Sequence, residues 1–274
     1  MIFHDFWPKL TRLFPRYFLS YNCKMVPNTF HFLFNDDVWT ELNTLCLKSC
    51  KIKSGAERII VYCGTAGSGS AWDEAHNIPG IEWNYGHFPC TLNGHIVSDR
   101  TIMRQYHGLY KLYLFGGFLC DLTFIFLKSF EEFRHAPVVI GLSCKAKKKL
   151  SNDLIGAEPE SPFIKDLIDT YKDVNPATEE TWIKASANDS WMLALQHKVS
   201  ILPRPTLFPW CSSNKQFVQG KPVLFKKSHA FRIWNNVDVA TLRKTCLGPT
   251  IAEIESGQAS TNVSVKSGLL FTFD

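Results

Sequence analysis

The chain has 274 residues, of which 45% are hydrophobic and 20% charged, so it can bury a large core and is not a disordered polypeptide. Its 30 Lys and Arg residues outnumber its 25 Asp and Glu residues, and the resulting charge of +5 suits a phosphate-bearing ligand but is too small and dispersed for a nucleic-acid-binding protein. This length favours one large α/β domain over a string of small modules.

We expect residues 1–25 to form an aromatic and basic arm ahead of a single domain at residues 26–274. The aromatic and leucine side chains of the arm interleave with lysine and arginine, which is typical of a helix lying on a membrane surface. Pro8 and Pro15 would interrupt such a helix. We therefore favour an arm packed against the domain, with peripheral membrane contact as the alternative.

The nine cysteines are spread along the chain, mostly within apolar runs, where a free cysteine behaves as a small hydrophobic residue. This usage favours a reducing compartment over a disulfide scaffold. No segment approaches the roughly 20 apolar residues of a membrane-spanning helix, and no signal peptide is recognisable. We therefore expect a soluble cytoplasmic protein.

The first buried strand is expected at residues 28–34, because this aromatic run ends at the polar cluster Asn35, Asp36 and Asp37. A helix over residues 38–50 and a second buried strand over residues 57–63 follow. This succession predicts a parallel sheet of the nucleotide-binding type. The glycine-rich segment that comes next lacks the spacing of a phosphate-binding loop, so we interpret it as a connection.

Residues 98–115 have the pattern of a helix that Gly116 and Gly117 end, and an apolar strand then continues on both sides of one charged residue, Asp121. A lone carboxylate is costly to bury, so Asp121 is expected to be functional, to cap a break or to pair with a cation. Further along we expect an amphipathic helix at 161–171, a proline-stiffened loop at 202–210, a short strand within 229–235 and an irregular segment beyond 245.

The run GGFLCDLTFIFLKSF, residues 116–130, resembles the Gly-Gly-x-Tyr-x-Asp-x-Asp-x-x-x-Leu-Lys segment of DXD-containing glycosyltransferases. That family includes globotriaosylceramide synthase, the yeast initiating α-1,6-mannosyltransferase and bacterial capsular sugar transferases. Further segments are similar in the same order, namely VPNTFHFLF with LNTLCLKSC, then LSNDLIGAEPESPFIKDLIDTY, then LFPW with SHAFRIWN. These scattered matches span residues 26–236.

The resemblance implies a GT-A fold, in which a Rossmann-like, mostly parallel sheet flanked by helices binds a sugar nucleotide at the carboxyl ends of its strands. It also implies transfer of a sugar from a UDP- or GDP-sugar to a glycan or other hydroxylated acceptor, typically with retention of anomeric configuration. A retaining mechanism needs no dedicated base, because the leaving phosphate oxygen can take the acceptor proton. An inverting enzyme would need a carboxylate, and Asp153 and Asp189 are the candidates.

The sequence departs from the family at the metal-binding motif. The family's DXD triplet holds a divalent cation on the donor pyrophosphate, and its counterpart here is Asp121-Leu122-Thr123. Arg232 occupies the position of the family's late histidine, and a guanidinium is not a metal ligand. We hypothesise that Arg232 binds the pyrophosphate directly, so that any Mn²⁺ or Mg²⁺ is weakly bound or dispensable. The alternative is a structural ion pair between Arg232 and Asp121 in a site that has lost its activity.

A second departure concerns the helix before the two glycines, where the family carries Ser-Asp-x-x-Arg. Counting back from Gly116, Gln105 holds the Asp position and Gly108 the Arg position, whereas Ser98 and Asp99 come six residues too early. Arg104 is adjacent to the motif, and an irregularity of one residue in the helix could bring it into contact with the donor.

The resemblance and the residue types together give the expected site. The expected catalytic residues are Asp121, Arg232 and Asp153. The expected donor-binding residues are Phe34, Asn35, Gln105, Gly117, Asp121, Thr123, Asn152, Arg232 and Trp234. The expected acceptor-binding residues are Asp153, Asp189 and Trp210.

Simpler roles remain open for several of them. The cluster after the first strand could cap the next helix, and Asp153 could be a turn residue. For Asp189 we slightly favour a helix cap, and for Trp234 core packing is at least as good an interpretation.

Two other functions compete with this one. A non-catalytic nucleotide- or sugar-binding protein on the same fold is supported by the degenerate DXD, and a membrane-surface scaffold by the aromatic arm. A zinc site at His87, Cys90 and His95 lacks a second ligand pair of convincing spacing and is disfavoured. Cys46 and Cys50, four residues apart on a helix, are expected in the core.

Overall fold

The computed structural model of the chain describes residues 25–36, 38–89, 91–92, 95–97, 99–144, 149–173, 189–209, 225–233, 237–245 and 247–257. Residues 1–24 of the arm, together with Asp37, Cys90, Trp210 and Trp234, lie outside the described residues.

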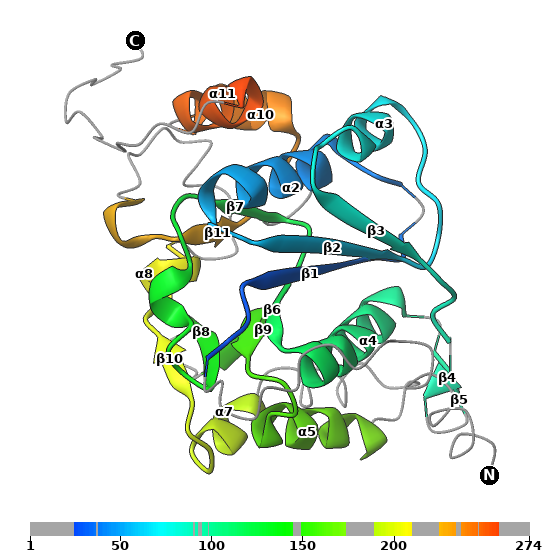
Figure 1. The fold of residues 1–274 in the computed structure, drawn as a ribbon, viewed down its shortest axis with the longest axis vertical. Helices are drawn as coiled ribbons and strands as arrows, with labels where there is room; N and C mark the ends of the chain where they lie inside the picture. The colour runs from blue at the N-terminus through cyan, green and yellow to red at the C-terminus, as the bar shows by residue number, and fades with distance from the viewer. Residues whose placement is uncertain are drawn as a thin grey trace.

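A seven-stranded sheet with the order β10-β8-β9-β6-β1-β2-β3 forms the centre of the molecule (Figure 1). Its strands are β1 Thr29–Phe34, β2 Arg58–Cys63, β3 Ile81–Tyr85, β6 Gly117–Cys120, β8 Val138–Cys144, β9 Lys149–Ala157 and β10 Ser200–Leu202. β1 is parallel to β2 and β6, β2 to β3, and β10 to β8, whereas β9 is antiparallel to both neighbours. The prediction of a mostly parallel sheet is thus confirmed.

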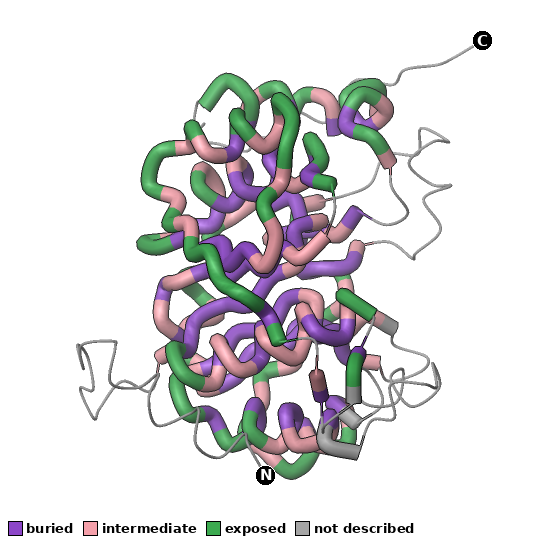
Figure 2. Tube along the Cα trace, turned by 90° about the vertical axis from the view of Figure 1, so that its right-hand side faces the viewer, coloured by how far each residue is buried: buried purple, intermediate pink, exposed green. Residues whose placement is uncertain are grey.

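Helices cover both faces of this sheet (Figure 1). The helices α2 (Glu41–Lys53) and α3 (Ser70–His76) lie on one face, and α4 (Arg100–Phe115), α5 (Pro162–Asp169) and α7 (Asp189–Ala194) lie on the other. Alternation along β1 explains the division, because Phe30, Phe32 and Phe34 pack on the side of α2 whereas Leu33 packs on the side of α4. The buried residues therefore form a central band between exposed outer surfaces (Figure 2).

A second, two-stranded sheet lies beside the first. It pairs β7 (Phe124–Phe126) with β11 (Ala230–Arg232) in antiparallel fashion. The short helices α10 (Val239–Arg243) and α11 (Gly248–Ser256) complete an apolar cluster with this sheet and the outer face of α2. The remaining elements are β4 Thr91–Leu92, β5 His95–Ile96, α8 Arg204–Leu207 and the 3₁₀ turns Glu131–Phe133, Thr170–Asp173 and Phe225–Lys227.

Two expectations about the C-terminal third are wrong. The predicted loop at 202–210 contains the helical turn α8. Pro203 precedes its first residue and Pro205 lies in its first turn. Proline is compatible with these positions, because backbone N–H groups in the first turn of a helix make no hydrogen bond within the helix. The segment beyond 245 contains α11 rather than irregular chain, because Ile251 and Ile254 recur at helical spacing and bury one face of it.

The two glycines join α4 directly to β6. Gly116 ends α4 with φ +63°, and Gly117 opens β6 with φ +99°, a conformation that favours glycine. A Cβ on Gly117 would lie 2.4 Å from the Thr29 carbonyl oxygen, so the close approach of β1 also requires glycine. His31 Nε2 lies 2.8 Å from the Gly116 carbonyl oxygen, and burial lowers the pKa of His31 to about 4. The neutral ring therefore donates Nε2–H to Gly116.

The cysteines whose side chains the structure describes are buried, as expected for Cys46 and Cys50. Cys46, Cys50, Cys63 and Cys120 are free thiols within the core. Over the described part of the chain, every helix is too short or too polar to cross a membrane.

Candidate active site

Asp121 lies where β6 ends, in the tight turn that leads to β7. Its Oδ1 accepts hydrogen bonds from the Thr123 backbone N–H at 3.0 Å and the Thr123 hydroxyl at 2.7 Å. β11 runs antiparallel to β7 and sets Arg232 opposite Phe124, and Ile233 N–H donates to the Thr123 carbonyl at 2.9 Å. The pairing of these two short strands therefore fixes Arg232 beside the Asp121 turn.

Asp153 reaches the same place from β9. β9 pairs with β6, and the Asp121 N–H donates to the Asp153 carbonyl at 2.8 Å. The Asp153 carboxylate forms an ion pair with Arg232 and accepts a hydrogen bond from the Ser151 hydroxyl at 2.5 Å. Arg232 also donates to the Thr123 hydroxyl at 3.2 Å, and its Nη2 lies 3.9 Å from Asp121 Oδ2. The structure thus brings together the three residues expected to be catalytic.

Arg104 is a second arginine at this turn. It projects from α4, and its Nη1 binds Asp36 Oδ2 at 2.7 Å while its Nη2 lies 3.8 Å from Asp121 Oδ2. The α-helix is continuous from Arg100 to Phe115, so Arg104 reaches the site without an irregularity. The Arg104 ion pair also brings Asp36, which follows β1, into the group.

The electrostatics of this group favour the charged forms. Burial alone would raise the pKa of the Asp121 carboxyl, but the charges of Arg232 and Arg104 and the hydrogen bonds from Thr123 lower it below its ordinary value. Burial opposes the charge of Arg232, yet Asp153 and Asp121 raise its pKa. Both side chains are less than one-fifth exposed, Arg232 at 19% and Asp121 at 15%. The group is therefore a network of two guanidinium ions and three carboxylates, in which Arg104, Arg232, Asp121 and Asp153 are largely buried and Asp36 is half exposed.

A cavity of about 380 Å³ lies at the carboxyl ends of β1 and β2, and two of its lining residues, Asn35 and Met103, directly precede Asp36 and Arg104 in the sequence. Asn35 lines it next to Asp36, and Thr65 Oγ1 donates to the Asp36 carbonyl at 2.9 Å. The walls combine apolar and polar groups and comprise Asn35, Gly64, Thr65, His87, Phe88, Ile96, Val97, Arg100 and Met103. The carboxyl ends of parallel strands in an open α/β sheet are where ligands of such folds bind. We call this cavity the strand-end cavity.

The other expected donor residues lie away from the two arginines. Phe34 packs in the core against Trp39, with ring centroids 4.9 Å apart. Gln105 accepts a hydrogen bond from the Tyr171 hydroxyl at 3.2 Å. Gly117 lies at the opposite end of β6 from Asp121. Asn152 and Asp153 are neighbours on β9, so their side chains point to opposite faces of the sheet. Asn152 therefore lies on the side of α7, where it accepts a hydrogen bond from Ser190.

Two expected residues lie outside the described residues, Trp210 and Trp234, and so does the side chain of Asp189, whose backbone begins α7.

The donor set at the turn does not fit a divalent cation as it is arranged. Asp36, Asp121 and Asp153 each face a guanidinium, so their oxygens are not grouped around a space for a cation. Within the described ranges, no group of three His, Cys, Asp or Glu side chains is arranged to hold a metal ion. Cys90 and the side chain of His95 lie outside those ranges, so the zinc alternative rests on residues that the structure does not describe.

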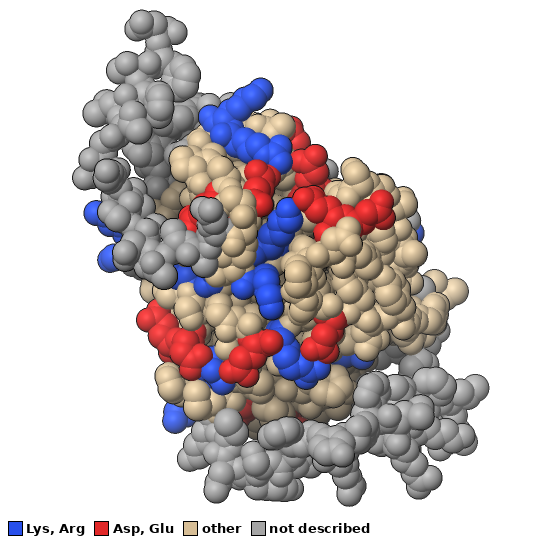
Figure 3. Space-filling model, turned by 45° about the horizontal axis from the view of Figure 1, so that its top comes forward, with Lys and Arg blue, Asp and Glu red and all other residues tan. Residues whose placement is uncertain are grey.

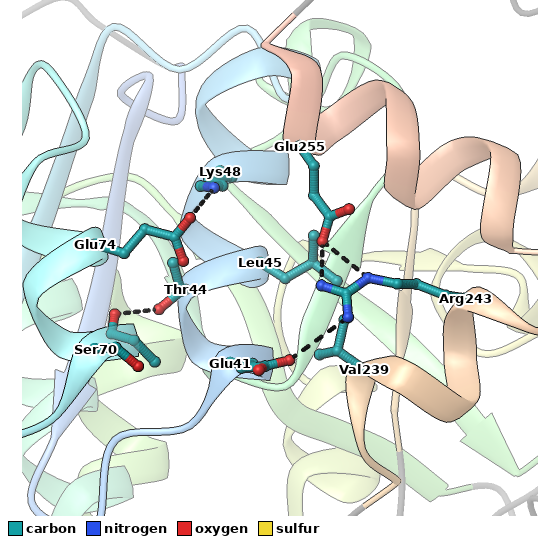
Figure 4. A pocket seen from close by; sticks show the side chains of 10 residues that line it. Glu41, Thr44, Leu45, Lys48, Ser70, Glu74, Val239, Arg243 and Glu255 are labelled. Atoms are coloured by element: carbon teal, nitrogen blue, oxygen red, sulfur yellow. Dashed lines mark hydrogen bonds and ion pairs between the residues drawn. The ribbon is translucent and has the colours of Figure 1, made fainter.

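A second cavity, of about 440 Å³, lies between α2, α3 and the C-terminal helices α10 and α11 (Figure 4). Arg243 binds Glu255 at 2.6 Å and approaches Glu41 at 3.9 Å, and Lys48 binds Glu74 at 2.7 Å. Basic and acidic side chains are interspersed on the surface in Figure 3. We call this cavity the helical cavity.

No protein-family model matches the sequence, and no curated protein matches it. Among solved structures, the glycosyltransferase GlyE of Streptococcus pneumoniae TIGR4 is similar with a TM-score of 0.51 at 12% identity over 84% of this chain. The chain spans 63% of the length of that structure. LgtC, a galactosyltransferase solved with donor and acceptor sugar analogs, gives 0.46 at 10% identity, covering 86% of this chain and 98% of LgtC.

The PaToxG glycosyltransferase gives a TM-score of 0.48 at 11% identity, covering 63% of this chain and 70% of PaToxG. The strand order and the likeness to GlyE establish an α/β fold of the GT-A type, which confirms the predicted fold class.

Sequence reasoning missed most of the strand-end cavity. His87 and Phe88 line it because they follow β3, which was not predicted, and Arg100 and Met103 line it from the first turn of α4. Recognition of β3 would have revealed the first pair, since residues that follow successive parallel strands meet at one edge of the sheet.

Proposed function

We propose that this chain is a glycosyltransferase that moves a sugar from a UDP- or GDP-sugar to a glycan or other hydroxylated acceptor. The nucleoside would occupy the strand-end cavity, and the pyrophosphate would lie at the Asp121 turn between Arg104 and Arg232. Asn35 would contact the nucleoside, while Thr123 and Asp121 would contact the phosphates or the donor sugar.

One observation carries the proposal. Two guanidinium groups from elements far apart in sequence converge within 4 Å of Asp121, and a largely apolar cavity lies at the carboxyl ends of β1 and β2, lined by the residues that precede Asp36 and Arg104. Guanidinium groups bind phosphates in pairs of parallel hydrogen bonds, and apolar walls with a few polar groups suit a nucleoside. The GT-A fold raises the expectation of glycosyl transfer but does not by itself establish an activity.

The proposed chemistry assigns each charged group one task. The bond between the anomeric carbon and the phosphate oxygen breaks with its electron pair on the phosphate, and Arg232 stabilises the charge that develops there. The acceptor oxygen bonds to the anomeric carbon, and its proton passes to the leaving phosphate oxygen. When Arg232 turns from Asp153 to the phosphate, the freed Asp153 carboxylate can accept hydrogen bonds from sugar hydroxyls. This assignment corresponds to retention of configuration.

A binding protein without activity is the second candidate, and the ion pair between Arg232 and Asp153 favours it. In the structure Arg232 already has a carboxylate partner, and replacing it with phosphate requires that pair to break. Calorimetry with a panel of UDP- and GDP-sugars, followed by assays of donor hydrolysis, separates the candidates. Binding with turnover supports the transferase, binding without turnover supports the second candidate, and binding of no donor contradicts both.

The metal dependence of the reaction is a further test. Because the carboxylates at the turn are paired with arginines rather than arranged around a cation, we expect turnover to persist in excess chelator within about threefold. The measurement is the rate of nucleotide release with and without the chelator. Loss of the activity in chelator and its specific recovery with Mn²⁺ would contradict the assignment of Arg232 as the phosphate-binding charge.

A further inference from the structure

The backbone of the Asp121–Thr123 turn is held by several elements at once. The Asp121 carbonyl lies 3.4 Å from Cys120 Sγ and 3.8 Å from Cys46 Sγ, and burial raises the pKa of both thiols, so they are protonated and donate weakly. The Thr123 carbonyl accepts from Ile233 N–H. The remaining carbonyl, that of Leu122, accepts from the Asn43 side chain at 3.2 Å.

Asn43 connects this turn to the first turn of α2. Its Oδ1 accepts from the Thr40 N–H at 2.8 Å, and its own N–H donates to the Thr40 hydroxyl at 3.3 Å, which completes a capping box. Because Oδ1 of Asn43 accepts from the Thr40 N–H, the Nδ2 group of the same amide faces the Leu122 carbonyl. The acceptor end of the amide thus meets a donor and its donor end meets an acceptor. The Asn43 side chain thus caps α2 through its oxygen and binds Leu122 through its nitrogen, and substitutions can remove one contact while keeping the other.

We propose that Asn43 is a positioning residue for the active site, an inference that rests on the proposed function. Its Nδ2–H₂ group fixes Leu122, and the residues on either side of Leu122 are Asp121 and Thr123, which contact Arg232. A small displacement of this turn would move both contacts at once. Loss of alignment by about 1 Å is enough to lower a rate by one or two orders of magnitude.

Asn43→Asp is the decisive variant, because it removes the donor to Leu122 and keeps the acceptor for Thr40. A carboxylate in the first turn of a helix is favourable, so the fold is retained. Asn43→Gln restores an amide donor and keeps the capping acceptor. Thr40→Val removes both contacts of the Thr40 hydroxyl with Asn43, one from the Asn43 N–H and one to its Oδ1, and retains the Thr40 N–H bond to Oδ1 and the Asn43 bond to Leu122. Asn43→Ala removes the donor without adding a charge near Asp121.

The measurements are the melting temperature, hydrogen–deuterium exchange of peptides covering residues 117–127, and kcat and KM for the donor that the calorimetric panel identifies. For Asn43→Asp and Asn43→Ala we expect faster exchange in the turn, with kcat lower by about tenfold and donor KM within about threefold. Asn43→Gln should recover most of the rate. Thr40→Val should lower the melting temperature without faster exchange in the turn.

Equal exchange in the turn of Asn43→Asp and the unchanged protein would overturn the inference. The same would follow if Thr40→Val loosened the turn and slowed the reaction as much as Asn43→Asp, since the effect would then belong to the helix cap. If the unchanged protein turns over no donor, the proposed function fails, and hydrogen exchange still decides whether Asn43 holds the turn.

Discussion

Two networks of arginine and carboxylate side chains within the described part of the chain lie near cavities of a few hundred Å³, and they differ mainly in burial. In the first, Arg232 contacts Asp153, Asp121 and Thr123 and is 19% exposed. In the second, at the helical cavity, Arg243 contacts Glu255 and Glu41 and is 45% exposed. The helical cavity is the larger of the two, at about 440 Å³ against about 380 Å³.

Position and burial, rather than size, distinguish a candidate active site here. Charges that are withheld from water interact strongly with one another and with a ligand, whereas exposed ion pairs are screened by solvent and salt. The buried network also lies at the carboxyl ends of parallel strands, and the exposed network lies on the outer surface of α2. The two networks should therefore respond very differently to the same kind of substitution.

The largest effect is expected for Arg232→Ala. The substitution leaves Asp153 and Asp121 buried without their shared cation, which should cost about 3–5 kcal/mol of unfolding free energy. Under the proposed function, donor turnover should fall by about 100-fold or more, since the positive charge of Arg232 would no longer face the leaving phosphate. Denaturant unfolding measures the first effect and initial rates measure the second. Arg232→Lys keeps the positive charge but loses the planar guanidinium, so its stability and its turnover should lie between those of Arg232→Ala and the unchanged protein. Unchanged donor affinity in Arg232→Ala would contradict the proposal that Arg232 binds the donor.

A smaller effect is expected from acid, through Asp121. The pKa of the Asp121 carboxyl is lower in the folded protein than in the unfolded chain. The unfolded chain therefore binds a proton at Asp121 more readily than the folded protein does. The stability that Asp121 contributes is complete above the unfolded pKa of about 3.9 and is lost as the pH falls through the lower folded value. Unfolding free energy measured from pH 7 to pH 3 should fall more steeply for the unchanged protein than for Asp121→Asn. Parallel curves for the two proteins would show that the ion pairs do not stabilise the charged carboxylate.

The smallest effect is expected for Arg243→Ala in the exposed network. Surface ion pairs contribute about 0–1 kcal/mol, so the unfolding free energy should change by less than about 1 kcal/mol. Donor affinity and turnover should be the same as in the unchanged protein within error. A clear loss of donor binding would mean that the helical cavity takes part in ligand binding, and the contrast between the two networks would then fail.

The sequence pattern predicted β1, α2, β2 and α4 in the first half of the chain but neither α3 nor β3, and it predicted fewer of the elements in the second half, for physical reasons. β1, β2 and α4 carry continuous apolar or periodic patterns, and the expected and observed bounds agree within a few residues. β8 and β9 were not predicted, and β9 is hard to recognise because Ser151, Asn152 and Asp153 interrupt its apolar pattern. Those polar residues make contacts of their own, because Asp153 binds Ser151 and Arg232 and Asn152 accepts a buried hydrogen bond from Ser190.

The candidate site was predictable where a single residue type stands out. A carboxylate within an apolar run marked Asp121, and the arginine in FRIWN marked Arg232. The access of Arg104 depends on the rotational phase of α4, and the contact of Asn43 with Leu122 depends on how α2 packs against the turn. Neither is encoded in local spacing, so both required the three-dimensional structure.

The junction of Gly116 and Gly117 has a consequence for the length of the chain. α4 passes into β6 with no intervening loop. The number of residues between a helical side chain and β6 therefore determines the direction in which that side chain points relative to the strand. One inserted residue would rotate α4 by about 100° and carry Arg104 out of reach of Asp121. Insertions and deletions should therefore be excluded between Arg104 and Asp121, even where neighbouring surface loops tolerate them. An alignment of this chain with another protein that places a gap there would pair the wrong arginine with the site.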